Sequence, residues 1–161
     1  MNYIGKNFLI ERVSASKISK KYGTPIYCYS YNRLKKNVLN LKKNFKSFRP
    51  LLCFSVKSNA NINLLKEIKK LGCGADVVSI GELIVALKAG INVNKIVFSG
   101  VGKNSKEIKY AIEKKILLIN AESKSEILEI ERISKSMNIS TNIGIRLNPN
   151  TDAKTLNKIS T

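Results

Sequence analysis

The residue best placed to do chemistry is Lys57, in the segment Leu-Leu-Cys-Phe-Ser-Val-Lys-Ser-Asn-Ala-Asn of residues 51–61. A run of apolar and small residues ends there and a polar turn follows, which is typical of a strand that delivers an amine at its carboxyl end. In the drier surroundings of such a strand end, a free lysine amine can attack a carbonyl carbon. On this segment alone, the favoured alternative is a strand-end lysine that only reaches water.

Short apolar runs alternate with amphipathic stretches around and after Lys57. The apolar runs predict strands, and the stretches with apolar residues at helical spacing predict helices that end at glycine or polar residues. The predicted strands lie at 51–57, 75–79, 95–100, 116–121 and 142–148. The predicted helices lie at 62–71, 81–90, 105–114 and 124–137.

The ends of these strands recur at a regular interval. Lys57, Ser79, Gly100, Glu122 and Arg146 stand 21 to 24 residues apart. A repeat of strand plus helix predicts parallel strands joined by helical crossovers. Without a GxGxxG turn, the order favours a barrel over a dinucleotide-binding sheet. The fold class is therefore α/β, an incomplete (β/α)8 barrel of about five units.

The residues before the first repeat have a different pattern. A short helix is predicted at 15–23, an extended segment at 24–29 and a basic amphipathic helix at 31–48. The apolar positions of the last helix predict a core-facing stripe. We interpret residues 1–25 as a separate N-terminal segment and residues 26–161 as the partial barrel.

Composition excludes several classes of protein. The 161 residues contain no histidine, so histidine triads and histidine metal sites are excluded, and the three cysteines lack CxxC spacing, so no metal site is predicted. The cysteine pattern fits a reducing cytoplasm. No apolar run is long enough to cross a bilayer and no signal peptide is predicted at the start, so no membrane association is expected.

The net charge of +18 raises the possibility of nucleic-acid binding, with the excess concentrated in residues 1–50. Aromatic residues are not interleaved with the basic ones as a stacking surface requires. The abundance of Lys, Ile and Asn together is better explained by codon bias spread over solvated faces. We therefore expect no nucleic-acid partner, although a basic interaction protein stays open as the least favoured alternative.

Several strand-end motifs resemble one known family. Phe-Ser-Val-Lys-Ser-Asn at 54–59 is similar to the cofactor-lysine motif, usually YAVKAN, of fold-type III pyridoxal-phosphate decarboxylases. Further similar segments, in order, are 22–27, 74–83, 86–90, 96–100 with Lys103, 120–123 and 146–149, followed by 152–154 and 158–161. The segments from Arg146 onward resemble the diaminopimelate decarboxylases of this family in particular. Ser58 is a mild departure from the usual alanine.

The resemblance implies an alanine-racemase-like barrel that holds pyridoxal 5'-phosphate, with residues 1–25 on the side of the family's β-rich domain. It implies that Lys57 binds the cofactor covalently as a Schiff base and is the catalytic residue. Asp76, Ser79 and Arg146 are the further cofactor-binding residues that it implies. For Asp76 the alternative is a cap or a partner of a backbone amide, and for Arg146 a buried ion pair with Glu122. Glu82 is expected to be an electrostatic cap in the first turn of its helix.

The function implied is decarboxylation of meso-diaminopimelate to L-lysine, in lysine biosynthesis, with an amino-acid substrate and a cytoplasmic homodimer. Alternatives are decarboxylation of ornithine, arginine or carboxynorspermidine, and a non-catalytic cofactor-binding barrel. In the family, the ring-stacking histidine, the glycine-rich phosphate loop and the substrate-binding residues follow the segments matched here. We therefore expect the chain to be an N-terminal part of such an enzyme and to be inactive alone.

Overall fold

A computed structural model describes residues 2–149 of the chain. The similar segments at 152–154 and 158–161 lie outside these described residues. Packing divides the chain into two compact units, Met1–Pro50 and Leu51–Thr161. This division by packing does not test the predicted segment boundary at residue 25, which stays a prediction.

The first unit contains a small antiparallel sheet that the sequence pattern did not predict. Its strands are β1 (Asn2–Ile4), β2 (Asn7–Ile10) and β3 (Val13–Ser14), and its helices are α1 (Ala15–Tyr22), α2 (Tyr31–Asn44) and the 3-10 helix η1 (Lys46–Phe48). The helix predicted at 31–48 is therefore divided, because its last turn tightens into η1. Glu11 ties the start of α2 to the strand end, since its carboxylate accepts hydrogen bonds from the Asn32 N–H and the Ser30 hydroxyl, both at 2.8 Å. These bonds lower the pKa of Glu11.

The second unit alternates strands and helices as predicted. The strands are β4 (Cys53–Ser55), β5 (Gly74–Val77), β6 (Ile96–Phe98), β7 (Leu118–Ala121) and β8 (Ile143–Ile145). The helices are α3 (Ile62–Lys70), α4 (Ile80–Lys88), α5 (Ser105–Glu113) and α6 (Lys124–Met137), with 3-10 turns η2 (Val56–Ser58) and η3 (Val93–Lys95). All neighbouring strands pair in parallel, in the order β4-β5-β6-β7-β8. The prediction of a partial barrel of parallel strands is confirmed within residues 51–149.

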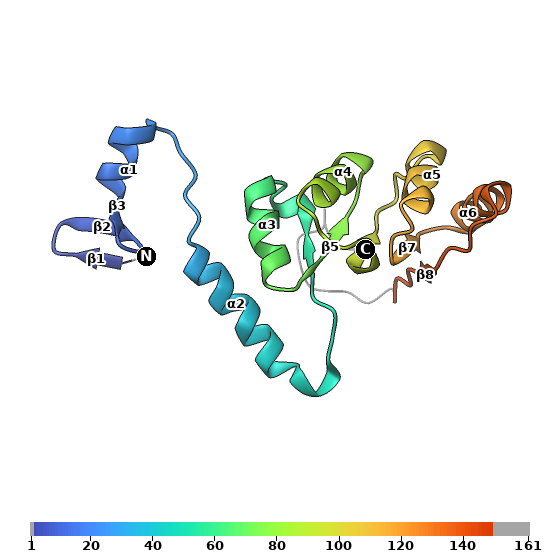
Figure 1. Cartoon of the computed structure of the whole chain (residues 1–161), viewed down its shortest axis with the longest axis horizontal. Helices are drawn as coiled ribbons and strands as arrows, with labels where there is room; N and C mark the ends of the chain where they lie inside the picture. Colours follow the sequence, from blue (N-terminus) through green and yellow to red (C-terminus); the bar gives the residue numbers. More distant parts are fainter. Residues whose placement is uncertain (1, 150–161) are drawn as a thin grey trace. The chain divides into compact units, whose positions relative to one another are not determined.

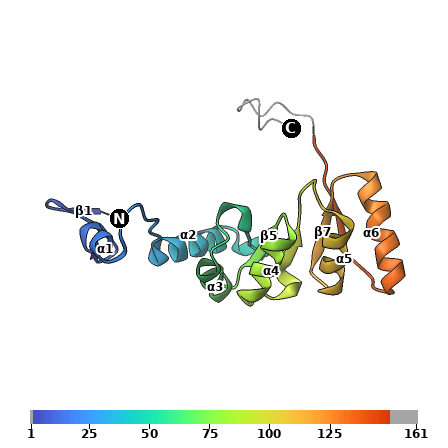
Figure 2. The ribbon, with the colours of Figure 1, turned by 90° about the horizontal axis from the view of Figure 1, so that it is seen from above.

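The core of this unit lies between the sheet and its helices. Figures 1 and 2 show α3, α4, α5 and α6 following one another along the sheet. Alternate strand residues point toward these helices and are fully buried, among them Val77, Phe98 and Ile119. Since side chains alternate along a strand, the intervening residues face away from the helices. Asp76 and Asn120 belong to this opposite face and are only partly buried.

The helix α5 begins with a cap that the sequence predicted. Asn104 Oδ1 accepts hydrogen bonds from the N–H groups of Lys106 and Glu107, and Glu107 Oε2 accepts one from the Asn104 N–H. The substitution Asn104→Ala removes the acceptor for two N–H groups, so we expect the free energy of unfolding to fall by about 1 kcal/mol. Urea denaturation followed by circular dichroism measures this. Asn63→Ala, at an exposed position of α3, is the matched control and should change little.

None of the helices within residues 2–149 is both long and apolar enough to cross a membrane.

Candidate active site at the carboxyl ends of the strands

Lys57 lies where the sequence placed it, directly after the first strand of the parallel sheet. The 3-10 turn η2 carries it, and two hydrogen bonds close this turn: Asn59 N–H to Val56 O at 2.9 Å and the Ser58 hydroxyl to Ser55 O at 2.7 Å. The expectation of a dry environment is wrong for this structure, because Lys57 is exposed. The physical reason is that β4 is an edge strand among the described residues.

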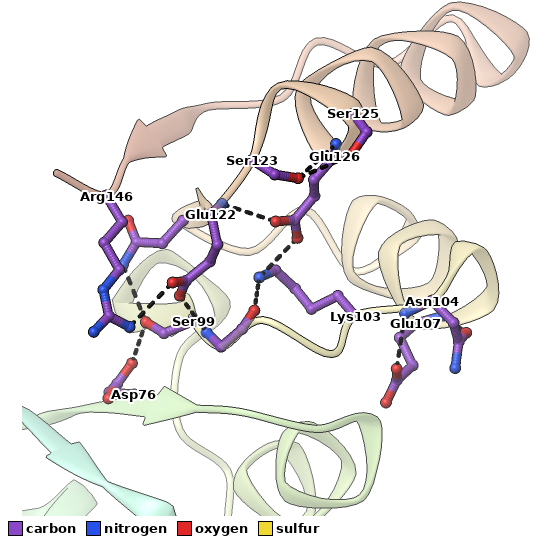
Figure 3. A network of polar contacts seen from close by, with 12 residues as sticks. Asp76, Ser99, Lys103, Asn104, Glu107, Glu122, Ser123, Ser125, Glu126 and Arg146 are labelled. Carbon is purple, nitrogen blue, oxygen red and sulfur yellow. Dashed lines mark hydrogen bonds and ion pairs between the residues drawn. The ribbon is translucent and has the colours of Figure 1, made fainter. Parts of the chain in front are cut away.

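Asp76 is the end of a relay of hydrogen bonds across three strand ends (Figure 3). The Ser99 hydroxyl donates to Asp76 Oδ1 at 2.7 Å, and Asn120 Nδ2 donates to Ser99 Oγ at 3.0 Å. The alternative of Asp76 as a helix cap or a backbone-amide partner is not what these contacts show. The relay orients a carboxylate on the face of the sheet that the helices leave uncovered.

Ser99 and Asn120 were not singled out from the sequence, although a signal for them was present. Ser99 follows Asp76 by 23 residues and Asn120 follows Ser99 by 21, which is the period of the strand–helix repeat. Polar residues that recur at the repeat length fall on the same face of neighbouring strands. The repeat length, applied to the polar residues on the face opposite the helices, therefore predicts the relay.

Next to Asp76, on the neighbouring strand β4, a buried hydroxyl has no hydrogen-bond partner. Ser55 pairs with Asp76 in the parallel register, and its Oγ is buried without a partner among the described residues. Buried polar atoms are nearly always hydrogen-bonded, so an unpaired one calls for an explanation. A polar ligand on this face would supply the partner. The donors and acceptors present therefore fit a polar group bound beside Lys57.

The thiol of Cys53 on the same strand is a poor candidate for a nucleophile. Burial raises its pKa, and the charges of Asp76 and Cys73 raise it further. The neutral thiol lies with its Sγ 3.8 Å from Lys95 O, to which it donates a weak hydrogen bond. Lys57 is thus a better candidate nucleophile on β4 and its turn than Cys53.

Ser79 and Glu82 have a structural role at the start of α4. Ser79 Oγ accepts a hydrogen bond from the Glu82 N–H at 3.3 Å, and Glu82 Oε2 accepts one from the Val78 N–H at 2.9 Å. The expectation that Glu82 caps its helix is confirmed. Ser79 therefore lies at the carboxyl edge of the sheet as the N-cap of α4, and its role toward a cofactor stays a prediction.

Arg146 follows β8 and forms an ion pair with Glu122, as the alternative interpretation expected. Arg146 Nη1 lies 3.0 Å from Glu122 Oε2, and the Arg146 N–H donates to Ala121 O at 3.0 Å. The arginine is not buried, however, since 45% of its side chain is exposed against 6% for Glu122. The structure joins Arg146 to Glu122 but places it at the opposite edge of the five-stranded sheet from Lys57.

Comparison with known proteins gives this site its class. Residues 31–161 match the family described as pyridoxal-dependent decarboxylase, pyridoxal binding domain. The chain is 48% identical over 145 residues to diaminopimelate decarboxylase of Helicobacter pylori strain J99, covering 90% of this chain and 36% of that protein. It is 40% identical over 161 residues to the Aquifex aeolicus enzyme of the same name, covering 100% and 38%.

Solved structures agree with these sequence relatives. The structure of diaminopimelate decarboxylase from Helicobacter pylori complexed with L-lysine superimposes with a TM-score of 0.87 at 45% identity, covering 91% of this chain and 37% of that one. The enzyme of the same name from M. jannaschii gives a TM-score of 0.89 at 36% identity, covering 98% and 38%. The chain thus spans little more than a third of the length of the relatives that it matches.

Five parallel strands joined by helices, with a lysine after the first strand, define the class of this protein. They form part of a cofactor-binding barrel of the alanine-racemase type. The chain belongs to the pyridoxal-dependent decarboxylase family, and its residues 31–161 match the pyridoxal-binding domain of that family. The cofactor of this family is pyridoxal 5'-phosphate. The unpaired Ser55 hydroxyl and the exposed amine of Lys57 at one strand end fit such a polar group.

Proposed function

We propose that this chain is the Lys57-bearing part of a pyridoxal-phosphate-dependent decarboxylase that converts meso-diaminopimelate to L-lysine. The observation that carries the proposal is the position of Lys57, exposed at the carboxyl end of β4 in a motif similar to the family's cofactor-lysine motif. Relatives named diaminopimelate decarboxylase, 48% and 44% identical to this chain, support the choice of substrate. A homodimer in a reducing cytoplasm is part of the same proposal.

The residues would hold the cofactor in distinct ways. The Lys57 amine is the point of covalent attachment, and Asp76, Ser79 and Arg146 supply polar contacts along the carboxyl edge of the sheet. When bound, pyridoxal phosphate supplies an acceptor for the electron pair left behind as carbon dioxide departs. Active sites of such barrels form at this edge, because every strand delivers its last residues there.

The relay behind Asp76 would give the site a fixed negative charge. The Ser99 hydroxyl donates to Asp76 Oδ1, and the Asn120 amide in turn donates to Ser99 Oγ. Because the Ser99 hydroxyl is itself held by Asn120, the carboxylate is oriented before a ligand binds. Strand β5, which carries Asp76, is the direct neighbour of β4. A positively charged group at the end of β4 would therefore be attracted toward this carboxylate.

Labelling with pyridoxal phosphate tests the proposal on this chain alone. After borohydride reduction, peptide mass spectrometry should find the adduct mainly at Lys57 at low cofactor concentration, although the chain has 24 lysines. Lys57→Ala should remove this dominant adduct. Lys66→Ala, which removes an exposed lysine of α3, is the matched control and should leave the adduct at Lys57. Diffuse labelling that Lys57→Ala does not change would overturn the proposal.

A further inference from the structure

A closed ring of four polar contacts links the loops that follow β6 and β7 (Figure 3). The Gly100 N–H donates to Glu122 Oε1 at 2.8 Å, and the Lys103 ammonium donates to the Gly100 carbonyl. Lys103 Nζ also lies 2.8 Å from Glu126 Oε1, and Glu126 Oε2 accepts a hydrogen bond from the Glu122 N–H at 2.8 Å. The ring thus returns to Glu122 and holds this residue by its side chain and by its backbone.

Gly100 is the part of the ring that needs a special backbone. Its φ of +101° is a conformation that residues with a side chain rarely adopt. This turn presents the N–H to the carboxylate of Glu122 and the carbonyl to the ammonium of Lys103. The peptide groups on either side of Gly100 are therefore held between an anion and a cation, and neither can rotate without losing a charged partner.

The ring is shielded from water. The side chain of Lys103 is 0% exposed and that of Glu126 10%, and the Lys103 ammonium lies 5.7 Å from the centre of the Phe98 ring. Interactions between charges are stronger and less screened in such surroundings. The ring is therefore a stiff support, in contrast to the exposed ion pairs on the outer face of α6.

Arg146 links this support to the open edge of the sheet. Glu122 uses one carboxylate oxygen for the ring and the other for Arg146, at 3.0 Å. Nearly half of the arginine side chain is exposed (45%). Its free side can meet a ligand, and its position depends on where Glu122 is held.

We propose that Lys103 is a positioning residue for Arg146. It fixes the Gly100 carbonyl, Gly100 fixes Glu122, and Glu122 aims the guanidinium at the carboxyl edge of the sheet. For the cofactor, this inference rests on the proposed function, in which Arg146 contacts pyridoxal phosphate. For the orientation of Arg146 it rests on the ring, which acts through Glu122, while Asn148 Oδ1 accepts a separate hydrogen bond from Arg146 Nε at 3.3 Å.

If Lys103 only stabilised the fold, its loss would not change the mobility of Arg146 once stability is restored. One double variant separates this structural role from the positioning role. Lys103→Met together with Glu126→Gln removes both buried charges while the glutamine oxygen can still accept the Glu122 N–H. We expect this double variant to recover the stability that Lys103→Met loses through the unpaired Glu126 carboxylate, while the Gly100 carbonyl stays without its cation. Lys135→Met with Glu131→Gln makes the same exchange in an exposed pair of α6 and is the matched control.

The measurement is the ¹H–¹⁵N heteronuclear NOE of the Arg146 Nε–H group, which is assigned by its loss in Arg146→Lys. Because Nε also donates to Asn148 Oδ1 at 3.3 Å, every chain compared carries Asn148→Ala, and the chain with this change alone is the unmodified reference. In the unmodified chain we expect a value close to that of the ordered backbone, and in the Lys103/Glu126 double variant a clear fall at unchanged circular dichroism. The Lys135/Glu131 control should keep the original value. An unchanged NOE in the Lys103/Glu126 double variant would overturn the positioning role.

Cofactor binding gives a second readout. We expect the Lys103/Glu126 double variant to bind pyridoxal phosphate about tenfold more weakly, the lower end of the range for residues that orient a ligand-binding side chain without touching the ligand. In an Arg146→Lys background this loss should disappear, since the effect acts through the arginine. An equal loss in both backgrounds would contradict the inference. If the unmodified chain fails to bind the cofactor while the NOE still falls, the proposed function fails and the positioning role stands.

Discussion

Replacing Lys103 with methionine is expected to lower the free energy of unfolding of residues 51–161 by about 3–5 kcal/mol. The substitution leaves the Glu126 carboxylate, with only 10% of its side chain exposed, without the cation that lies 2.8 Å away. It also removes the donor to the Gly100 carbonyl. Urea denaturation followed by circular dichroism measures the change, provided that the variant is compared at the same pH and salt concentration.

The exposed pair of Lys135 and Glu131 is the control for this prediction. These residues also form a lysine–glutamate contact, at 2.6 Å, but their side chains are 76% and 51% exposed. Lys135→Met should therefore cost less than about 1 kcal/mol, because water replaces the lost partner. If Lys103→Met costs no more than Lys135→Met, the buried ring does not hold the loops together as its contacts indicate.

The order of strands and helices was predictable because two local signals agree. Apolar runs mark the buried strands, and helical spacing with glycine stops marks the crossovers, so each unit from Lys57 to Arg146 could be read without its neighbours. The strand ends were less accurate: β6 ends at Phe98 and β8 at Ile145, whereas the sequence predicted strands to Gly100 and Asn148. The residues past these ends are Ser99 and Gly100 after β6 and Arg146, Leu147 and Asn148 after β8, and a sequence pattern does not show where pairing with the neighbouring strand stops.

The contacts within the candidate site were harder to predict than the positions of its residues. Lys57, Asp76 and Arg146 lie at strand ends as expected, but which side chains meet depends on the register between strands. The pair of Glu122 and Arg146 was named from the sequence as an alternative, but the contact of Asp76 with Ser99, 23 residues away, was not. No local pattern distinguishes Ser99 from other polar residues at the same edge, since the register is set by packing of the whole sheet.

Two expectations failed for reasons of environment. Lys57 is exposed because β4 is an edge strand within residues 51–149. The hairpin of β1 and β2 was missed because its polar residues, such as Asn2 and Asn7, do not have the composition of a strand.

Replacing Gly74 with alanine is expected to lower the free energy of unfolding by about 3 kcal/mol, at the upper end of the usual range for overpacking. A Cβ atom on Gly74 would lie 2.0 Å from the backbone oxygen of Lys95 and 3.0 Å from Cys53 Sγ. A backbone oxygen cannot move aside as a side chain does, so β5 must shift away from the segment that leads into β6. Thermal or urea denaturation monitored by circular dichroism gives the loss.

Gly144→Ala is the comparison, because its added methyl group would meet a side chain, whereas that of Gly74→Ala would meet a backbone oxygen. Its added Cβ would lie 2.4 Å from Asn120 Oδ1, the far end of a flexible side chain that can rotate. We expect about 1 kcal/mol, mainly from the lost hydrogen bond between Asn120 and Ser99. Equal losses for the two alanine variants would mean that the Lys95 carbonyl yields as easily as a side chain, and that β5 and β6 are less tightly packed than their contacts indicate.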